Sequence, residues 1–147
     1  MAHVNPNAAP GQVPSQIRAL FPADFARLLH LSYASYEILD HMLKTDATGR
    51  LGELISNCEE AWYTWVAFGD DLSHHLLLAS LDSEASIVIR RNLAKELSTI
   101  RTFLYYRQDS FQIEDLEDLQ RAFAALVRLI DPVAPSLGGK YSLKVKR

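Results

Sequence analysis

The 147-residue chain lacks most of the features that mark specialised classes of protein. Its single cysteine, Cys58, has no second thiol with which to form an internal disulfide, so nothing points to an oxidising compartment. Six glycines and six prolines are few enough that disorder is expected only towards the ends. We therefore expect a small protein of a reducing, cytoplasmic setting.

Long apolar runs and a strong charge imbalance are also missing. No apolar stretch approaches the roughly 18 residues that a membrane span requires, and the N-terminal MAHVNPNAAPGQVPSQ has neither the basic start nor the apolar core of a signal peptide. The formal net charge of −3 would not draw the whole molecule to a polyanion, although a local basic face still could. We expect no membrane contact, and a nucleic-acid ligand stays open.

What the chain does contain is a set of apolar residues at helical spacing. Stripes with three- and four-residue steps run over residues 25–43, 51–79, 89–104 and 116–130. No segment alternates with a period of two for long enough to form a strand. The pattern predicts an all-α protein, an antiparallel up-and-down four-helix bundle with its stripes facing inward.

Turn and capping residues set the expected helix boundaries. Pro22 suits the first position of the first long helix, and TDATGR ends that helix. Gly69 falls in the second stripe without breaking its phase, which predicts a kink or a close packing contact and leaves the continuity of this helix open. The third helix is expected to be capped by Asp82 or Ser83, and the fourth by Asp109 or Ser110.

The two ends differ in composition from the middle of the chain. Residues 1–14 carry three prolines, two asparagines and a glycine, which is typical of an extended arm. The last residues, VAPSLGGKYSLKVKR, combine a loop with a short basic tail. We therefore divide the chain into an extended Pro-rich arm (1–14), a helical bundle domain (15–131) and a loop with a basic tail (132–147).

The stretch GDDLSHH holds the residues that most resemble a chemical site: Asp70, Asp71, His74 and His75. Metal sites in bundles use carboxylates and histidines that point inward from facing helices, whereas helical periodicity turns these side chains away from the apolar stripe. Asp and His four residues apart also stabilise a solvated helix face. We expect no metal and no cofactor. If a metal is bound, these four residues are the candidates, and a pH-sensitive or intersubunit contact stays open.

The end of the same helix is apolar nearly all round. Leu77 and Leu78 point away from the stripe that Leu76 continues, and Leu81 follows shortly after. Such a segment is covered either by another part of the chain or by another molecule. The sequence alone leaves both alternatives open.

The third predicted helix has the most asymmetric surface. It presents basic and aromatic side chains away from its apolar stripe, among them Arg90, Arg91, Lys95, Arg101 and Tyr105. Such a face can be simply solvated, can bind a protein, or can contact phosphates and stack bases. The acidic IEDLED at the start of the fourth helix complements its charge, which suggests self-association between the two surfaces.

Three further residues are assigned to the core or its edge. Trp62 and Trp65 lie on the stripe and are expected to be core anchors, with a ligand pocket near Tyr36 as the alternative. Cys58 lies on the same stripe and is expected to be an inert buried thiol.

These features favour a non-enzymatic helical-bundle interaction protein, acting as a structural or adaptor subunit of a larger assembly that can be homo-oligomeric. The expected partner-binding residues are Leu77, Leu78, Leu81, Arg90, Arg91, Lys95, Arg101 and Tyr105. The first alternative is a nucleic-acid-associated accessory subunit that uses the basic and aromatic face of the third helix. The second is a metal-binding bundle protein.

Overall fold

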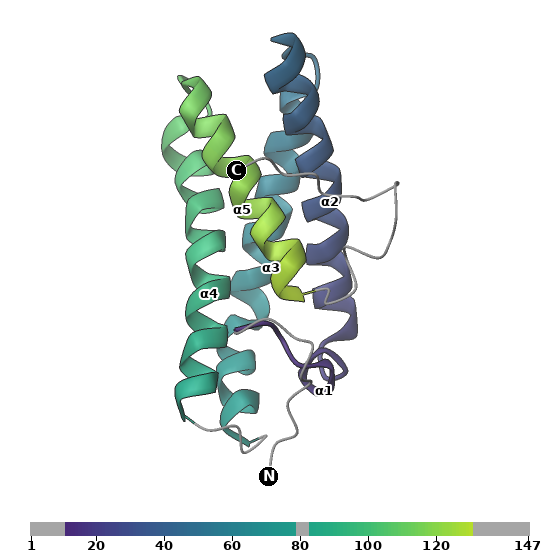
Figure 1. Ribbon diagram of the computed structural model, residues 1–147, viewed down its shortest axis with the longest axis vertical. Coiled ribbons are helices and arrows are strands. Elements are labelled where there is room, and N and C mark those ends of the chain that lie inside the picture. Colours follow the sequence, from purple (N-terminus) through teal and green to yellow (C-terminus); the bar gives the residue numbers. More distant parts are fainter. Residues whose placement is uncertain (1–10, 79–82, 131–147) are drawn as a thin grey trace.

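The computed structural model describes residues 11–78 and 83–130, and these ranges form an all-helical structure (Figure 1). The all-α prediction is therefore confirmed. None of the described helices combines the length and the apolar character that a membrane span requires. The helical segments, in chain order, are α1 (Ser15–Arg18), α2 (Pro22–Thr45), α3 (Leu51–Leu78), α4 (Ser83–Thr102), the π-helical η1 (Phe103–Arg107) and α5 (Ile113–Ile130).

The four long helices lie side by side around a shared core. Helix α2 packs against α3 and α5, and α4 packs against the same two helices (Figure 1). Full burial of a leucine, isoleucine or phenylalanine stabilises the fold by about 1.5–3 kcal/mol. All four long helices supply such fully buried side chains, including Leu28, Ile38, Leu54, Leu72, Leu93, Ile100 and Phe123.

Helix α2 begins where the sequence predicts. Pro22 occupies the first turn, where its missing N–H costs nothing, and Asp24 lies near the positive end of the helix dipole. The helix ends at Asp46, which adopts a left-handed conformation with φ of 57° and donates its backbone N–H to the Met42 carbonyl over 2.9 Å. Both boundaries thus have a local cause.

Helix α3 runs without interruption through Gly69. This glycine is buried, and a Cβ atom placed on it would lie 3.3 Å from the indole ring of Trp65. The position is therefore a close packing contact, one of the two roles expected for it. The unbroken helix fixes the directions of Asp70, His74 and all the residues that follow.

The end of the α4 segment is π-helical, a form that the apolar stripe of this helix does not indicate. The helical path widens into η1 and continues to Arg107 before the chain turns. Phe111 then packs on Phe103 of η1, with 5.9 Å between the ring centroids. The turn therefore carries an aromatic anchor into the core, and α5 starts only at Ile113.

The predicted cap of the fourth long helix at Asp109 or Ser110 is wrong for this reason. The backbone N–H of Gln112 instead donates to the carboxylate of Asp115 over 2.8 Å, so a side chain inside the first turn satisfies the free donor. The other predicted capping side chains, Asp82 and Ser83, lie outside what the structure describes.

Part of the predicted N-terminal arm packs on the end of α5. The buried Val13 donates its backbone N–H to the Leu129 carbonyl over 2.8 Å, and the Gln12 side chain donates to the Arg128 carbonyl over 2.7 Å. The last carbonyls of a helix have no partner within the helix, so residues 12 and 13 act as its cap. Residues 1–10 and 131–147 lie outside the described ranges, and the division of the chain into arm, domain and tail stays a prediction.

Gly11 makes this path possible, and substituting it tests the contact. Its φ is +80°, and a Cβ there would lie 2.1 Å from Asn92 Nδ2 and 2.9 Å from Val88 Cγ1. We expect Gly11→Ala to lower the free energy of unfolding by about 1 kcal/mol or more in urea titrations. Gly52→Ala is the matched control, because its Cβ meets nothing within 4 Å in α3, and it should stabilise by a few tenths of a kcal/mol. Equal effects of the two substitutions would contradict the assignment.

Candidate interaction surface

One exposed stripe follows α3 along the side that faces α4. The stripe consists of Glu59, Tyr63, Val66 and Asp70. Steps of four, three and four residues keep these side chains on one face of the helix. Tyr63 and Val66, in the middle, are 56% and 57% exposed, so they place neighbouring apolar surface on the outside of α3. Two exposed acidic residues, Glu59 and Asp70, lie at the ends of the stripe.

Arg101 of α4 joins this stripe to the neighbouring helix. Its guanidinium carbon lies 5.6 Å from the centre of the Trp62 ring and 5.4 Å from that of Tyr105. A cation at this distance from an aromatic face is stabilised by about 0.5–1 kcal/mol at an exposed site. Arg101 is thus held between an aromatic residue of α3 and one of η1.

A second arginine bridges the same two helices near their other end. The guanidinium of Arg90 lies 4.7 Å from the centre of the Trp65 ring, and its Nε donates to the hydroxyl of Ser73 over 2.6 Å. Ser73 in turn donates to the Gly69 carbonyl over 3.4 Å. Arg90 is therefore half-buried and fixed in direction, whereas the adjacent Arg91 is exposed.

Two tyrosines complete the surface. Tyr63 lies next to Tyr105, and this neighbouring hydroxyl raises the pKa of the Tyr63 hydroxyl. Tyr105 is 49% exposed although its ring also contacts Arg101. We call the whole set the α3–α4 face: Glu59, Trp62, Tyr63, Val66, Asp70, Arg90, Arg91, Arg101 and Tyr105.

The charges of the α3–α4 face are not neutralised within the described part of the chain. Glu59, Asp70 and Arg91 form no ion pair with any described residue. The opposite flank of α3 differs, because Glu60 forms a two-fold ion pair with Arg27 of α2 that lowers the pKa of the Glu60 carboxyl. Glu60 is thus neutralised by α2, whereas Glu59, Asp70 and Arg91 of the α3–α4 face are not neutralised by any described residue.

The residues predicted to bind a partner divide into three groups. Arg90, Arg91, Arg101 and Tyr105 belong to the α3–α4 face. Lys95 is exposed but lines a groove between α4 and α5, so it does not share a surface with Arg90. Leu78 is 65% exposed at the end of α3, while the Leu77 side chain and the whole of Leu81 lie outside the described residues.

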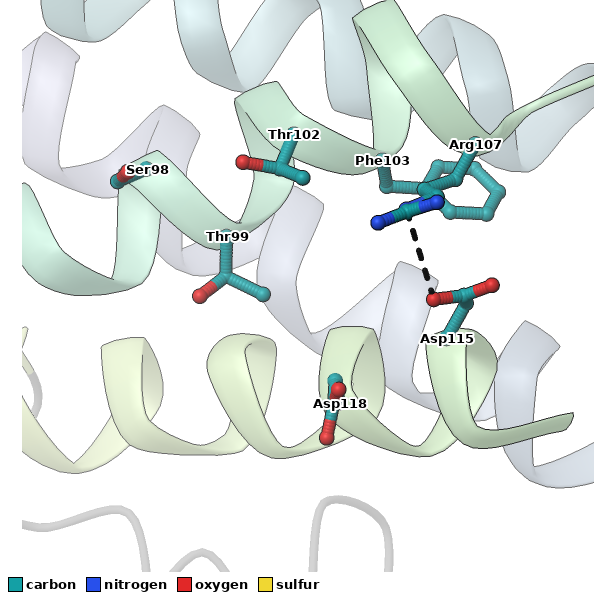
Figure 2. Close-up of a pocket in the computed structure, with 7 residues that line it drawn as sticks. All are labelled: Ser98, Thr99, Thr102, Phe103, Arg107, Asp115 and Asp118. Atoms are coloured by element: carbon teal, nitrogen blue, oxygen red, sulfur yellow. Dashed lines mark ion pairs between the residues drawn. The ribbon is translucent and has the colours of Figure 1, made fainter. Parts of the chain in front are cut away.

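The groove between α4 and α5 is the second surface feature, and Figure 2 shows its polar lining. One cavity of about 210 Å³ takes hydroxyls from α4 and carboxylates from α5, and Arg107 reaches Asp115 across it at 3.9 Å. A neighbouring cavity of about 390 Å³ shares Thr99 and Asp118 with it. Asp118 also pairs with Arg121. Part of the IEDLED charge that suggested self-association is therefore used inside the chain.

The Asp and His stretch points in several directions. Asp70, Asp71 and His74 are exposed, while His75 is half-buried with its ring edge against Phe21, 5.2 Å between centroids. Nδ1 of His75 lies 2.8 Å from the Asp71 carbonyl oxygen. Within residues 11–78 and 83–130, no three His, Cys, Asp or Glu side chains gather closely enough to hold a metal ion.

No protein-family model, no curated protein and no solved structure matches the chain. The contacts of the α3–α4 face therefore carry the functional argument.

The sequence pointed to only half of this face. The basic and aromatic residues of α4 stood out because they interrupt an otherwise simple pattern. The exposed stripe of α3 was missed, although Glu59, Tyr63, Val66 and Asp70 repeat at helical spacing outside the apolar stripe. A second periodic pattern on a helix that already has a core stripe is the signal that could have revealed it.

Cys58 provides a test of the packing beneath this face. Its thiol is fully buried, and burial raises its pKa far above the ordinary value, so the reactive thiolate is strongly disfavoured. We expect no alkylation of native protein by iodoacetamide at pH 8 over an hour, and complete alkylation in denaturant, both followed by mass spectrometry. Rapid labelling of the native protein would show that α3 is not packed as described.

Glu96 provides a test of the groove between α4 and α5. Burial raises the pKa of the Glu96 carboxyl, because the folded protein favours the protonated form. The stability that this form contributes is present below the ordinary pKa and is lost as pH rises through the raised pKa. We expect Glu96→Gln to melt at a higher temperature than the wild type at pH 7. Below about pH 4 the carboxyl is protonated in both folded and unfolded states, and the difference should vanish. The exposed Glu37→Gln on α2 is the control and should show no such pH-dependent gain.

Proposed function

We propose that this protein is a non-enzymatic interaction protein that binds another protein through the α3–α4 face, as a structural or adaptor subunit of a larger assembly. The observation that carries the proposal is the position of Arg101 between Trp62 and Tyr105. Tryptophan, tyrosine and arginine are the residues most enriched among those that dominate binding energy in protein interfaces.

Preorganisation supports the same conclusion. A flexible arginine or tyrosine loses about 0.5–1.5 kcal/mol of side-chain freedom when a partner immobilises it. Arg101 and Arg90 already lie on indole rings, and the Tyr105 ring is already in contact with Arg101. Much of this ordering cost is therefore met before any partner arrives.

The proposal takes the four long helices as an antiparallel up-and-down bundle in a cytoplasmic setting. The packing of α2 and α4 each against both α3 and α5 supports this arrangement. In such a bundle, the outer surfaces of two consecutive helices form one broad face. The single, deeply buried cysteine is compatible with a reducing compartment.

A nucleic-acid partner is the runner-up. Arginines beside exposed tyrosines favour it, because this combination contacts phosphates and stacks bases. Glu59 and Asp70 weigh against it, because two exposed carboxylates on the same face repel a phosphate backbone. The metal-binding alternative is less well supported still, since Asp70 and His74 point to solvent while His75 packs on Phe21.

Site-specific cross-linking in cells of the source organism tests the proposal. A photoreactive benzoylphenylalanine replaces Val66 in the middle of the face, and in the control protein it replaces Ala26, which is exposed on α2. We expect a discrete cross-linked protein product from position 66, lost when Arg101→Glu is added, and none from position 26.

Two results would contradict this expectation. Identical products from both positions would mean that the face has no special role. Cross-links to RNA or DNA, together with salt-sensitive binding of labelled single strands to the purified protein, would replace the proposal with the runner-up.

A further inference from the structure

The charges of the α3–α4 face are spaced alike on its two helices. Glu59 and Asp70 are eleven residues apart on α3, and Arg90 and Arg101 are eleven residues apart on α4. Eleven residues make close to three helical turns, so each pair lies on one side of its helix. At about 1.5 Å per residue, both pairs are separated by about 16 Å.

The two sets of charges also lie at similar heights along the helices. Arg101 contacts Trp62, three residues after Glu59, and Arg90 contacts Ser73, three residues after Asp70. Each arginine is therefore offset from an acidic residue by about 4.5 Å along the axis, which an arginine side chain spans. Within one chain these pairs are not made, because the guanidinium groups lie on aromatic rings and a hydroxyl instead.

We propose that the partner of the α3–α4 face is a second copy of this chain, related by a two-fold axis that runs parallel to α3 and α4. This inference rests on the proposed function and names its partner. Such an axis lays α3 of each copy over α4 of the other at the same height. Glu59 then faces Arg101 of the second copy, and Asp70 faces Arg90 and Arg91.

The apolar part of the face falls in the right place for this arrangement. Tyr63 and Val66 lie between the two acidic residues along α3, so the contact has an apolar centre and charged ends. Interfaces between proteins commonly have this distribution, with the anchoring side chains in the centre and charges at the rim. Symmetry forms each favourable charge contact twice.

The other face-to-face arrangement brings like charges together. A two-fold axis at right angles to the helices would lay α3 over α3 and α4 over α4. The carboxylates of Glu59 and Asp70 would then meet acidic residues, and the arginines would meet arginines. Like charges across an interface disfavour association, so the charge pattern selects the parallel axis.

A pair of charge-reversed variants tests the proposal. Asp70→Arg and Arg91→Glu change exposed side chains without an ion pair in the described part of the chain, so the fold should tolerate both. We expect the wild type to dimerise in sedimentation equilibrium, more weakly in 0.5 M than in about 0.05 M salt. Each variant alone should dimerise at least about tenfold more weakly.

Mixing the two variants restores the charge contact between positions 70 and 91, while Arg90 still faces an arginine in one of the two symmetric contacts. Arg at position 70 of one chain then faces Glu at position 91 of the other, and Asp70 of the second chain faces Arg91 of the first. We therefore expect an equimolar mixture to dimerise more tightly than either variant alone and more weakly than the wild type. Glu37→Arg on the outer side of α2 is the control and should dimerise like the wild type.

Three results would overturn the inference. A wild type that stays monomeric at all protein and salt concentrations would exclude the second copy as partner. Dimerisation that neither variant weakens would exclude this face, and a mixture that fails to recover would exclude the parallel axis. If the wild type stays monomeric but position 66 cross-links to a different protein, the proposed function stands without this inference. If the wild type stays monomeric and position 66 gives no cross-linked protein, both the inference and the proposed function are wrong.

Discussion

Each of the four long helices has to bury an apolar stripe against its neighbours, and this requirement decides which side chains remain for the surface. On α3, the fully buried positions use up one side of the helix. Trp65 fits almost wholly inside, whereas Trp62, three residues earlier, lies at the edge where α3 meets α4. The seam between these two helices therefore exposes aromatic surface, and this surface has to be covered by something other than the core.

Arginine side chains cover that seam, with consequences for charge. A guanidinium lying on an indole shields apolar surface from water. Its positive charge is not neutralised, because the contact involves no carboxylate. On the other flank of α3, Arg27 and Glu60 satisfy each other across the boundary with α2. Arginine thus has different roles at the two boundaries of α3: it forms an ion pair at the α2 boundary and lies on aromatic rings at the α4 boundary. The boundary built on aromatic rings leaves Arg101 and its acidic neighbour Glu59 available to another molecule.

The sequence predicted those parts of the structure that depend on a single helix. Periodicity is a local property, so it gave the helical class, the start of α2 at Pro22 and the outward direction of His74. It did not give η1 or the late start of α5, because these depend on Phe111 reaching Phe103 in the core. It also grouped Lys95 with Arg90, although one lies towards α5 and the other towards α3. Which flanks become one surface depends on the order in which helices pack, and no single stripe contains that information.

The cap that Gln12 and Val13 place on α5 joins positions 116 residues apart in the chain. A ribosome makes residues 12 and 13 well before the carbonyls of Arg128 and Leu129, so the valine side chain stays without its final packing site while the residues between them are made. The last turn of α5 gains this cap only when the two segments meet. Loss of residues 12 and 13 would consequently loosen a helix end that lies 116 residues further along the chain.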